Sequence, residues 1–447
     1  MTPIKKIPEV STFTFLRQAI KILNNPLPFH HKNFERYGDI FKLNVGFGKH
    51  AIFSRDAVLA EYVLQKNWKN YKKSAIQTED LAKYLGNGLL TSEGTYWRKQ
   101  RKLIQPAFHK SNLESLMATV KQTIVESLVE IKTDVKTDVL PLFSDLAFKV
   151  VVRALFSNAA SDSEIKTLQH VTEENQLMLV KELRQPYLKW YFESFGIIDR
   201  HLKRSNESRD ILKNIIIRRK ESQTRFDDLL DMLLEARYED GTEMSMNQLI
   251  DEILVLFVAG HETTANALSF TIQLLAQHTE WQENILSQYQ SILKNNNNDI
   301  MAAIIQSQLA KQVVEESLRL YPPAYFIDRV NIESDSCNGY HFDKGNNLLF
   351  SIYEIHRHKA LWEFPDSFVP ERFAPENAKN YSSQYFPFGS GPRKCIGNNF
   401  AMFEMILTIS EILLKFSIKP VKDNIEINPL ITLKPKNAFV KFEILKS

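Results

Sequence analysis

The sequence has little cysteine and almost no excess of one charge. Two cysteines in 447 residues, Cys337 and Cys395, cannot build a disulfide framework, which suits a reducing compartment. Lys and Arg number 56 and Asp and Glu 53, so the net charge of +3 is too small to indicate nucleic-acid binding. The content of 44% hydrophobic and 24% charged residues is that of an ordinary globular protein.

Long apolar runs are also missing. The run ILVLFVAG at 253–260 is far shorter than the roughly 18 residues of a membrane span, so no span is predicted. The N-terminus lacks the apolar core and the cleavage site of a secretory signal. It does place Phe13, Leu16, Ile20 and Leu23 on one helical face. We expect this helix to pack on the body of the protein, and contact with a membrane surface is the alternative.

Helical periodicity dominates the rest of the chain. Amphipathic helices are predicted over 111–132, 163–183, 207–236, 245–278 and 398–416. Strand-like segments are short, and they are DIFKLNVG at 39–46, KHAIFS at 49–54, NNLLFSIYEI at 346–355 and FVKFEIL at 439–445. The pattern predicts a mainly α fold with small β-sheets.

The stretch FGSGPRKCIGNNF gives the rare thiol of Cys395 an unusual setting. The predicted apolar helix begins just after it, so unpaired N–H groups and the positive end of the helix dipole lie nearby. Such a position lowers the pKa of a thiol and favours the metal-binding thiolate. Gly389 and Gly391 let the chain bend tightly, Gly397 leaves the helix start bare, and Arg393 adds a cation.

Four roles fit a cysteine in this setting. A buried structural residue in a tight turn is the commonest role of a lone cysteine. A catalytic thiol would need a base such as histidine. A zinc site would need further ligands, and the distant Cys337 in ESDSCNGY lacks metal-ligand spacing. A planar cofactor with one axial thiolate needs a single protein ligand, and haem bound in this way favours O–O cleavage.

The cysteine stretch resembles the haem-binding signature of the cytochrome P-450 superfamily. Phe, Gly, Arg, Cys and Gly recur there at the spacing that is held here by Phe388, Gly391, Arg393, Cys395 and Gly397. The resemblance covers nearly the whole chain. It implies one large triangular, mainly α haem domain over 1–447, with haem b bound by the Cys395 thiolate beside Ile396 and without a bound flavin.

A second motif lies in the segment EESLRL. Glu316 and Arg319 are three residues apart, so their side chains meet on one helical face, where a surface ion pair would contribute less than about 1 kcal/mol. In context the pair resembles the E-x-x-R motif of the superfamily. Its third partner is the arginine of a P-E-R-F segment, which VPERF supplies as Arg372. The resemblance implies a structural triad that holds the cysteine segment in place.

A third motif lies in LFVAGHETTANAL. Gly260 inside a helix costs about 0.5–1 kcal/mol relative to alanine, which the close approach of a ligand would explain. Ala259, Gly260, Glu262 and Thr263 resemble the oxygen-binding groove of the superfamily. The resemblance implies that the threonine hydroxyl supports dioxygen and that the acid delivers protons. His261 is expected to be a peripheral helix residue rather than a ligand.

Further arginines and a tryptophan match haem-anchoring positions. GTYWRKQRKLIQPAF resembles the C helix of the superfamily, where Trp97 and Arg101 would reach the haem propionates. Arg329 and Arg393 stand at other propionate positions. The basic residues between 98 and 110 form either a solvated face or a docking surface for an acidic electron donor.

Together the motifs imply a haem-thiolate monooxygenase that inserts one oxygen atom of O2 into a substrate. Apolar stretches at 81–90, 174–183, 256–260 and 323–327 favour an apolar substrate such as a fatty acid, terpenoid or carotenoid. A donor-independent peroxygenase or isomerase is the alternative, although the acid–alcohol pair counts against it. A non-catalytic haem sensor is a third reading, and it would not need that pair.

The sequence also predicts the partners. No reductase sequence follows the cysteine loop, so we expect electrons to come from a ferredoxin or flavodoxin and its reductase. We expect a cytoplasmic monomer without nucleic acid or a membrane span, with contact at a membrane surface as an option.

Overall fold

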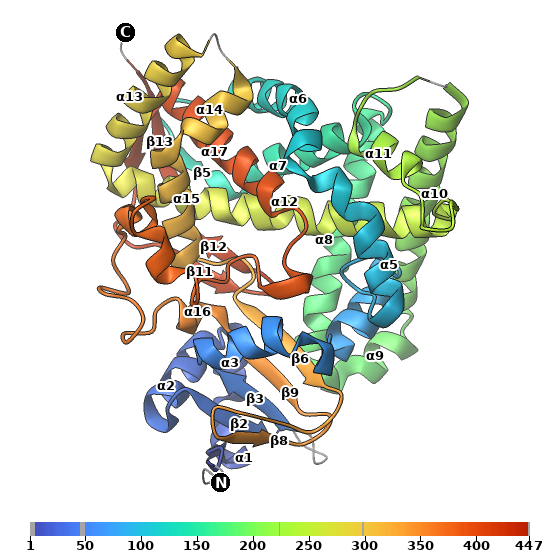
Figure 1. Ribbon diagram of the computed structural model, residues 1–447, viewed down its shortest axis with the longest axis vertical. Helices are drawn as coiled ribbons and strands as arrows, with labels where there is room; N and C mark the ends of the chain where they lie inside the picture. The colour runs from blue at the N-terminus through green and yellow to red at the C-terminus, as the bar shows by residue number, and fades with distance from the viewer. Residues whose placement is uncertain (1–4, 45–49, 223, 297–298, 446–447) are drawn as a thin grey trace.

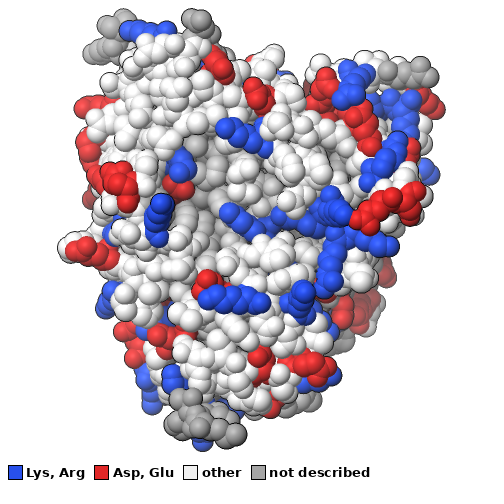
Figure 2. Space-filling view, in the orientation of Figure 1, with Lys and Arg blue, Asp and Glu red and all other residues white. Residues whose placement is uncertain are grey.

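The computed structural model describes residues 5–44, 50–222, 224–296 and 299–445. Most helices gather in one broad part of the molecule, and the largest sheet lies in a narrower part near the N-terminus (Figure 1). The outline is therefore wide at the helical end and tapers toward the sheet (Figure 2). The predicted mainly α fold with small β-sheets is confirmed.

Long helices form the main core. They are α6 (Lys110–Leu128), α7 (Val139–Phe156), α8 (Asp162–Arg184), α10 (Ile197–Ser222), α12 (Met246–Gln277), α13 (Thr279–Asn295), α15 (Gln308–Leu320) and α17 (Asn398–Lys415). The shorter helices are α1 (Thr12–Asn24), α2 (Leu27–Tyr37), α3 (Ala57–Glu61), α4 (Ala82–Leu85), α5 (Gly94–Ile104), α9 (Lys189–Ser194), α11 (Leu229–Glu235), α14 (Ile300–Gln306) and α16 (Ile352–Ile355). Four of the five predicted helices agree with α6, α8, α12 and α17 to within a few residues.

The helix predicted over 207–236 is wrong as a single element, because α10 and α11 divide it. The buried guanidinium group of Arg219 donates to the carboxylates of Asp228 and Asp231. Asp228 also caps α11 by accepting from the N–H of Asp231 at 3.0 Å. This buried charge network stabilises a break that helical periodicity does not reveal.

The sheets are small. The largest has the strand order β1 (Glu9–Val10), β2 (Ile40–Asn44), β3 (His50–Ser54), β9 (Asn347–Ser351), β6 (Phe326–Asn331) and β4 (Tyr71–Lys72). A three-stranded sheet joins β10 (Phe416–Pro420), β13 (Phe439–Ile444) and β5 (Lys136–Asp138), and two hairpins pair β7 (Asp335–Cys337) with β8 (Tyr340–Phe342) and β11 (Glu426–Pro429) with β12 (Leu433–Lys436). The strand predicted over 346–355 stops halfway, because the Ser351 side chain caps α16 by accepting from the Glu354 N–H.

The central helix α12 begins with a capping box, in which the side chains of Ser245 and Gln248 each bond the other residue's backbone N–H. It packs mainly along α7 and is buried over most of its length. By length and composition alone, α12 could cross a membrane, but 67% of its apolar window is buried inside the protein. It is therefore the core helix of the fold.

The N-terminal helix α1 differs from expectation. Phe13 and Ile20, on the face expected to pack, are 76% and 77% exposed. Phe15 and Ile22 contact the neighbouring core cluster instead. The expected packing face is wrong, and the Leu16 side chain lies outside the described part of the chain.

Candidate active site

Tight turns place Cys395 just before α17, as the motif predicts. Gly389 and Gly391 have φ values of +70° and +68°. A Cβ atom on Gly391 would lie 2.1 Å from the carbonyl oxygen of Leu64, so only glycine fits there. The N–H of Cys395 donates to the carbonyl of Phe388 at 2.9 Å. These contacts fix the backbone on both sides of the bend.

The predicted low pKa of the Cys395 thiol is wrong for the protein by itself. Burial raises the pKa of the thiol and outweighs the Gly397 N–H and the charges of Arg101 and Lys394, which lower it. The residue as a whole is nevertheless exposed. A thiol in this setting ionises when it binds a metal cation.

One face of α12 is open in the middle of an otherwise buried helix. Ala259 is exposed and Gly260 and Thr263 are half-buried, whereas Phe257 and Glu262 are buried. The hydroxyl group of Thr263 donates to the carbonyl of Ala259 at 2.8 Å. The four residues of the predicted oxygen-binding motif therefore lie on one accessible turn and its buried flank.

Gly260 and His261 lie where α12 packs against α7. A Cβ atom on Gly260 would lie 3.0 Å from Cγ2 of Val151, so the neighbour that this glycine accommodates is α7. His261 is buried rather than peripheral, packs edge-on against Phe148, and donates from Nδ1 to the Phe257 carbonyl at 2.7 Å. Burial lowers the pKa of His261. Both positions are explained by helix packing.

Glu262 has partners that the sequence did not indicate. Its Oε1 atom accepts from the hydroxyl group of Thr432 and lies 3.2 Å from Nζ of Lys434. Both residues belong to the hairpin β11–β12 and its turn, about 170 positions further along the chain. No motif links them to α12, so only the fold could reveal this ion pair.

Buried cations gather near Trp97 of α5. Burial and the neighbouring Arg393 lower the pKa of Arg329 to about 10. Burial lowers the pKa of Lys73 to about 7, and the charges of Arg329 and Arg393 act in the same direction. Lys73 donates to the carbonyls of Leu89 and Ser92 at 2.8 Å each. The sequence analysis missed Lys73, which has no motif around it.

Arg393 lies between two indole rings and has one acidic partner. Its guanidinium carbon is 5.3 Å from the ring centre of Trp68 and 5.1 Å from that of Trp97. It pairs with the carboxylate of Glu93, while its buried Nε atom has no partner. Besides Glu93, the carboxylates of Glu252 and Asp328 act on Lys73 and Arg329, so the cluster holds charges of both signs. The unpartnered Nε atom of Arg393 and the buried guanidinium group of Arg329 are donors that fit the propionate groups of a haem.

The remaining predicted haem residues border the cysteine loop. Arg101 donates to the carbonyl of Lys394, next to Cys395, at 2.9 Å. Phe388 and Ile396 are half-buried and pack against the main core. A Cβ atom on Gly397 would have no neighbour closer than 3.9 Å, so the start of α17 is open.

The structure brings Glu316, Arg319 and Arg372 together as the resemblance implies. Glu316 accepts two hydrogen bonds from Arg319, at 2.7 and 2.8 Å, and lies 3.4 Å from Nε of Arg372. Arg319 also donates to the carbonyls of His356, Pro365 and Ser367. The pair Glu316–Arg319 is fully buried.

His356 connects this triad to the cysteine segment. Its Nδ1 atom donates to the carbonyl of Arg319 at 3.2 Å, and its Nε2 atom accepts from the N–H of Phe386 at 2.9 Å. Because Nε2 must accept, the imidazole is neutral, and burial lowers its pKa well below the usual value. The described residues contain no group of three or more His, Cys, Asp or Glu side chains placed to hold a metal ion.

A cysteine on a tight loop, accessible at the start of a helix and accompanied by buried arginine side chains, is characteristic of a haem-thiolate protein. The family model "Cytochrome P450" matches residues 6–442, and the chain therefore belongs to the cytochrome P450 family. It is a monooxygenase of this family that uses haem with a thiolate ligand.

Relatives from distant organisms resemble the chain over most of its length. Cytochrome P450 4d2 of Drosophila melanogaster is 28% identical over 88% of this chain and 84% of that protein. Cyclooctat-9-en-7-ol 5-monooxygenase of Streptomyces melanosporofaciens is 26% identical over 91% of this chain and 88% of that protein. Among solved structures, retinoic acid bound cyanobacterial CYP120A1 has a TM-score of 0.82 at 25% identity and full coverage of both chains. The cytochrome P450DA heme domain shares the fold with a TM-score of 0.86 at 21% identity, covering 99% of this chain and 98% of that one.

Proposed function

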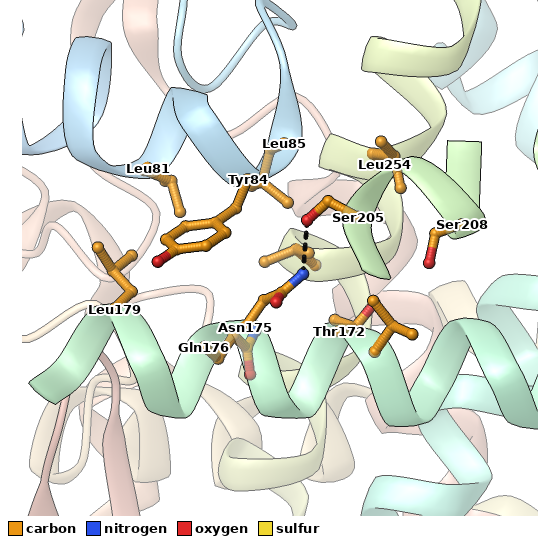
Figure 3. A pocket seen from close by; sticks show the side chains of 12 residues that line it. Leu81, Tyr84, Leu85, Thr172, Asn175, Gln176, Leu179, Ser205, Ser208 and Leu254 are labelled. Atoms are coloured by element: carbon orange, nitrogen blue, oxygen red, sulfur yellow. Dashed lines mark hydrogen bonds between the residues drawn. The ribbon is translucent and has the colours of Figure 1, made fainter. Parts of the chain in front are cut away.

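We propose that the chain is a single haem domain that hydroxylates or epoxidises an apolar lipid or terpenoid with electrons from a separate protein. The observation that carries the substrate class is a small cavity between α4, α8, α10 and α12 (Figure 3). The cavity has a volume of about 20 Å³, so a substrate would need neighbouring side chains to move. One side of it is apolar, with Leu81, Leu85, Val171, Leu179, Leu254 and Val258, and the other side carries the polar groups of Tyr84, Thr172, Asn175, Gln176, Ser205 and Ser208. The apolar residues come from or adjoin three of the four expected apolar stretches, and the stretch 323–327 does not line this cavity.

The proposed roles of the chain's own groups follow from their positions. Cys395 provides the sulfur ligand, and bound haem supplies the activation of dioxygen. Arg329, Arg393 and Lys73 offset the charge of the propionates. Val258 is next to the accessible Ala259, so the cavity adjoins the open turn of α12. The Thr263 hydroxyl group lies on this turn, where it donates to the Ala259 carbonyl at 2.8 Å.

The substrate class is tested with purified haem-loaded protein and a panel of fatty acids, terpenes and carotenoids. Apolar lipids are expected to shift the Soret band on binding and to give oxygenated products when O2 and a reducing system are present. Short polar acids of similar headgroup chemistry serve as the control. A panel in which only the polar controls bind would contradict the proposed substrate class.

A basic surface supports docking of an acidic electron donor. Lys and Arg side chains form a band over α5 and the loop before α17 (Figures 1 and 2). Lys99 and Lys110 are exposed there. Lys102 is paired with Glu239, so its charge is partly compensated. A ferredoxin or flavodoxin with a negative face is the proposed partner.

Reversing Lys99 and Lys110 to glutamate is expected to slow electron transfer by roughly tenfold or more at low salt, because steering by opposite charges is lost. The difference should shrink at high salt, where screening is strong. Stopped-flow reduction by a ferredoxin measures the rate, and peroxide-driven turnover should be unchanged. Reversal of Lys166 and Lys213, exposed on α8 and α10, is the matched control. Equal slowing by both pairs would show that net charge, not docking at α5, is responsible.

Thr263→Ala is expected to retain haem and substrate binding but to release more hydrogen peroxide and less product per electron pair. The reason is the loss of the hydroxyl group on the open turn of α12. The product formed per reducing equivalent is the measurement. Thr264→Ala is the matched control, because that hydroxyl is buried and donates to the Gly260 carbonyl at 2.9 Å. Equal coupling in both variants and the parent would exclude the proposed role of Thr263.

We also propose a cytoplasmic monomer with a peripheral contact at the membrane surface. The exposed side chains of Phe13 and Ile20 on α1, beside the exposed Arg17 and Lys21, support this contact. An apolar substrate partitions into membranes, so such a contact would bring the enzyme to its substrate.

A further inference from the structure

Neutral polar groups of α8 and α10 meet at the small cavity beside α12. The side-chain amide of Asn175 donates to the hydroxyl group of Ser205 at 2.8 Å, as Figure 3 shows. Ser208, one turn further along α10, also lines the cavity. Its Oγ atom is buried and has no hydrogen-bond partner among the described residues. A buried hydroxyl group without a partner costs free energy, so this atom is ready to bond a polar group of a ligand.

The amide group of Asn175 is held in one orientation. Its Oδ1 atom lies 3.1 Å from Nδ1 of His201 and can only accept, so the imidazole donates there. Burial lowers the pKa of His201 and favours the neutral ring. Because Ser205 accepts from the amide, its own hydroxyl hydrogen remains free to donate. The cavity therefore offers two hydroxyl groups, those of Ser205 and Ser208, to an oxygen atom of a ligand.

The cavity offers no charge to a ligand. All twelve side chains that line it in the described part of the chain are neutral. The cations next to lining residues in the sequence are each paired with an acid: Lys83 with Glu182, Arg204 with Glu174 and Arg209 with Asp251. A carboxylate buried here would lose its hydration without gaining an unpaired cation, which is costly. A neutral polar group loses much less.

The size of the cavity indicates which part of a substrate it accommodates. A volume of about 20 Å³ is enough for a group of the size of one water molecule. Leu254 and Val258 of α12 lie on its apolar side, and Val258 adjoins the accessible turn at Ala259. A substrate can thus place a small polar end at α10 while its apolar body extends along α12.

We propose that Ser208, together with the pair Asn175–Ser205, selects a substrate that carries a neutral hydroxyl or carbonyl oxygen on an apolar body. The inference rests on the proposed function, because it names the substrate class for that same cavity. Terpenoid and lipid alcohols or ketones are the substrates of this class. Free acids are disfavoured by the missing cation, and plain hydrocarbons leave the Ser208 hydroxyl group without a partner.

The first measurement compares ligands that differ only at one end. Purified haem-loaded protein is titrated at neutral pH with farnesol, farnesoic acid and farnesane, and with hexadecanol, hexadecanoic acid and hexadecane, and the Soret shift is followed. In the series that binds more tightly, the alcohol is expected to bind about tenfold more tightly than the acid and the hydrocarbon. An acid or a hydrocarbon that binds as tightly as the alcohol would overturn the inference.

Ser208→Ala is expected to reduce the preference for the alcohol over the hydrocarbon by about tenfold and to leave hydrocarbon binding unchanged. Ser410→Ala is the matched control, because the Oγ atom of Ser410 is also buried without a partner but Ser410 lies on α17, away from the cavity. An unchanged preference in Ser208→Ala, or an equal loss in Ser410→Ala, would contradict the proposed role of Ser208.

Gln176→Lys tests the argument from charge. Gln176 lines the cavity and is half-buried, so a lysine there can supply the missing cation. This variant is expected to bind the acid about tenfold more tightly than the parent does, with no gain for the hydrocarbon. Gln169→Lys, on the same helix but outside the cavity, is the matched control. An equal gain in both variants, or none in Gln176→Lys, would count against the inference.

The two proposals fail in different ways. If alcohols and hydrocarbons bind equally well, the apolar substrate class stands and the selection by Ser208 is wrong. If no member of either series binds to the haem-loaded protein, the proposed function fails and the inference fails with it.

Discussion

Cys395→His is expected to move the absorption band of the reduced carbon monoxide complex from the red-shifted thiolate position to that of histidine-ligated haem. Monooxygenase turnover should fall to the background level, because a neutral imidazole does not donate electron density as a thiolate does. Absorption spectra of the reduced protein with carbon monoxide measure the ligand directly. Turnover with a lipid substrate and a reducing system measures the consequence.

The chain supplies its own control for this substitution. Cys337, the other cysteine, is half-buried on β7, and burial together with Asp56 and Asp335 raises the pKa of its thiol. Cys337→Ala is expected to keep both the thiolate spectrum and the activity. A thiolate spectrum that disappears in Cys337→Ala and persists in Cys395→Ala would overturn the assignment.

The raised pKa of the Cys395 thiol adds a second expectation. The helix start, Arg101 and Lys394 all favour the thiolate, yet burial outweighs them in the protein alone. The iron cation of haem therefore has to supply the missing stabilisation of the negative sulfur. Haem-free protein is thus expected to react more slowly with a thiol-alkylating reagent at neutral pH than an ordinary exposed cysteine does.

Local motifs were the part of the site that sequence could predict. The bend before Cys395 needs only nearby glycines, and the i, i+3 spacing of Glu316 and Arg319 guarantees contact on any helix. The open turn of α12 was likewise encoded in consecutive residues. In each case the residues that form the sequence motif are the same residues that form the structural feature.

Contacts between distant segments could not be predicted in this way. Lys434 reaches Glu262 from a hairpin far along the chain, and Lys73 joins Arg329 and Arg393 through a segment without any motif. Their sequence neighbours look like ordinary surface residues. Only the packing of β12 against α12 brings Lys434 to Glu262, and only the packing of the segment around Lys73 against α5 buries Lys73.

Periodicity and a small residue did not identify the neighbouring element at two places. The pattern on α1 favoured the face with Phe13 and Ile20, but Phe15 and Ile22 contact the core. Gly260 was expected to accommodate a ligand, and the neighbour it meets is Val151 of α7. Periodicity identifies an apolar face or a small residue, but not the element that will occupy the space.

Arg319→Leu is expected to cause the largest loss of stability. Arg319 is fully buried and makes five hydrogen bonds, two of them to Glu316. Its removal leaves the buried carboxylate of Glu316 with only Arg372 at 3.4 Å and the N–H of Val369. Breaking a buried ion pair from one side costs about 3–5 kcal/mol. That is a large share of the roughly 5–15 kcal/mol that stabilises a typical protein.

Arg319→Leu should also bind less haem than the parent, because His356 links Arg319 to Phe386 at the entry of the cysteine segment. The haem-to-protein ratio and the melting temperature of each purified variant are the measurements. Arg319→Lys keeps the charge but not the paired donors, so it should fall between Arg319→Leu and the parent in both.

Arg219→Leu separates general destabilisation from an effect on the cysteine segment. Arg219 is also buried and pairs with two carboxylates, but it joins α10 to α11 rather than the triad to the cysteine segment. Arg219→Leu should lower the melting temperature about as much as Arg319→Leu does, but it should lose less haem. If the two leucine variants lose haem in the same proportion to their loss of stability, the triad contributes only to the overall fold. A selective loss in Arg319→Leu would instead show that the triad holds the cysteine segment in the geometry that haem requires.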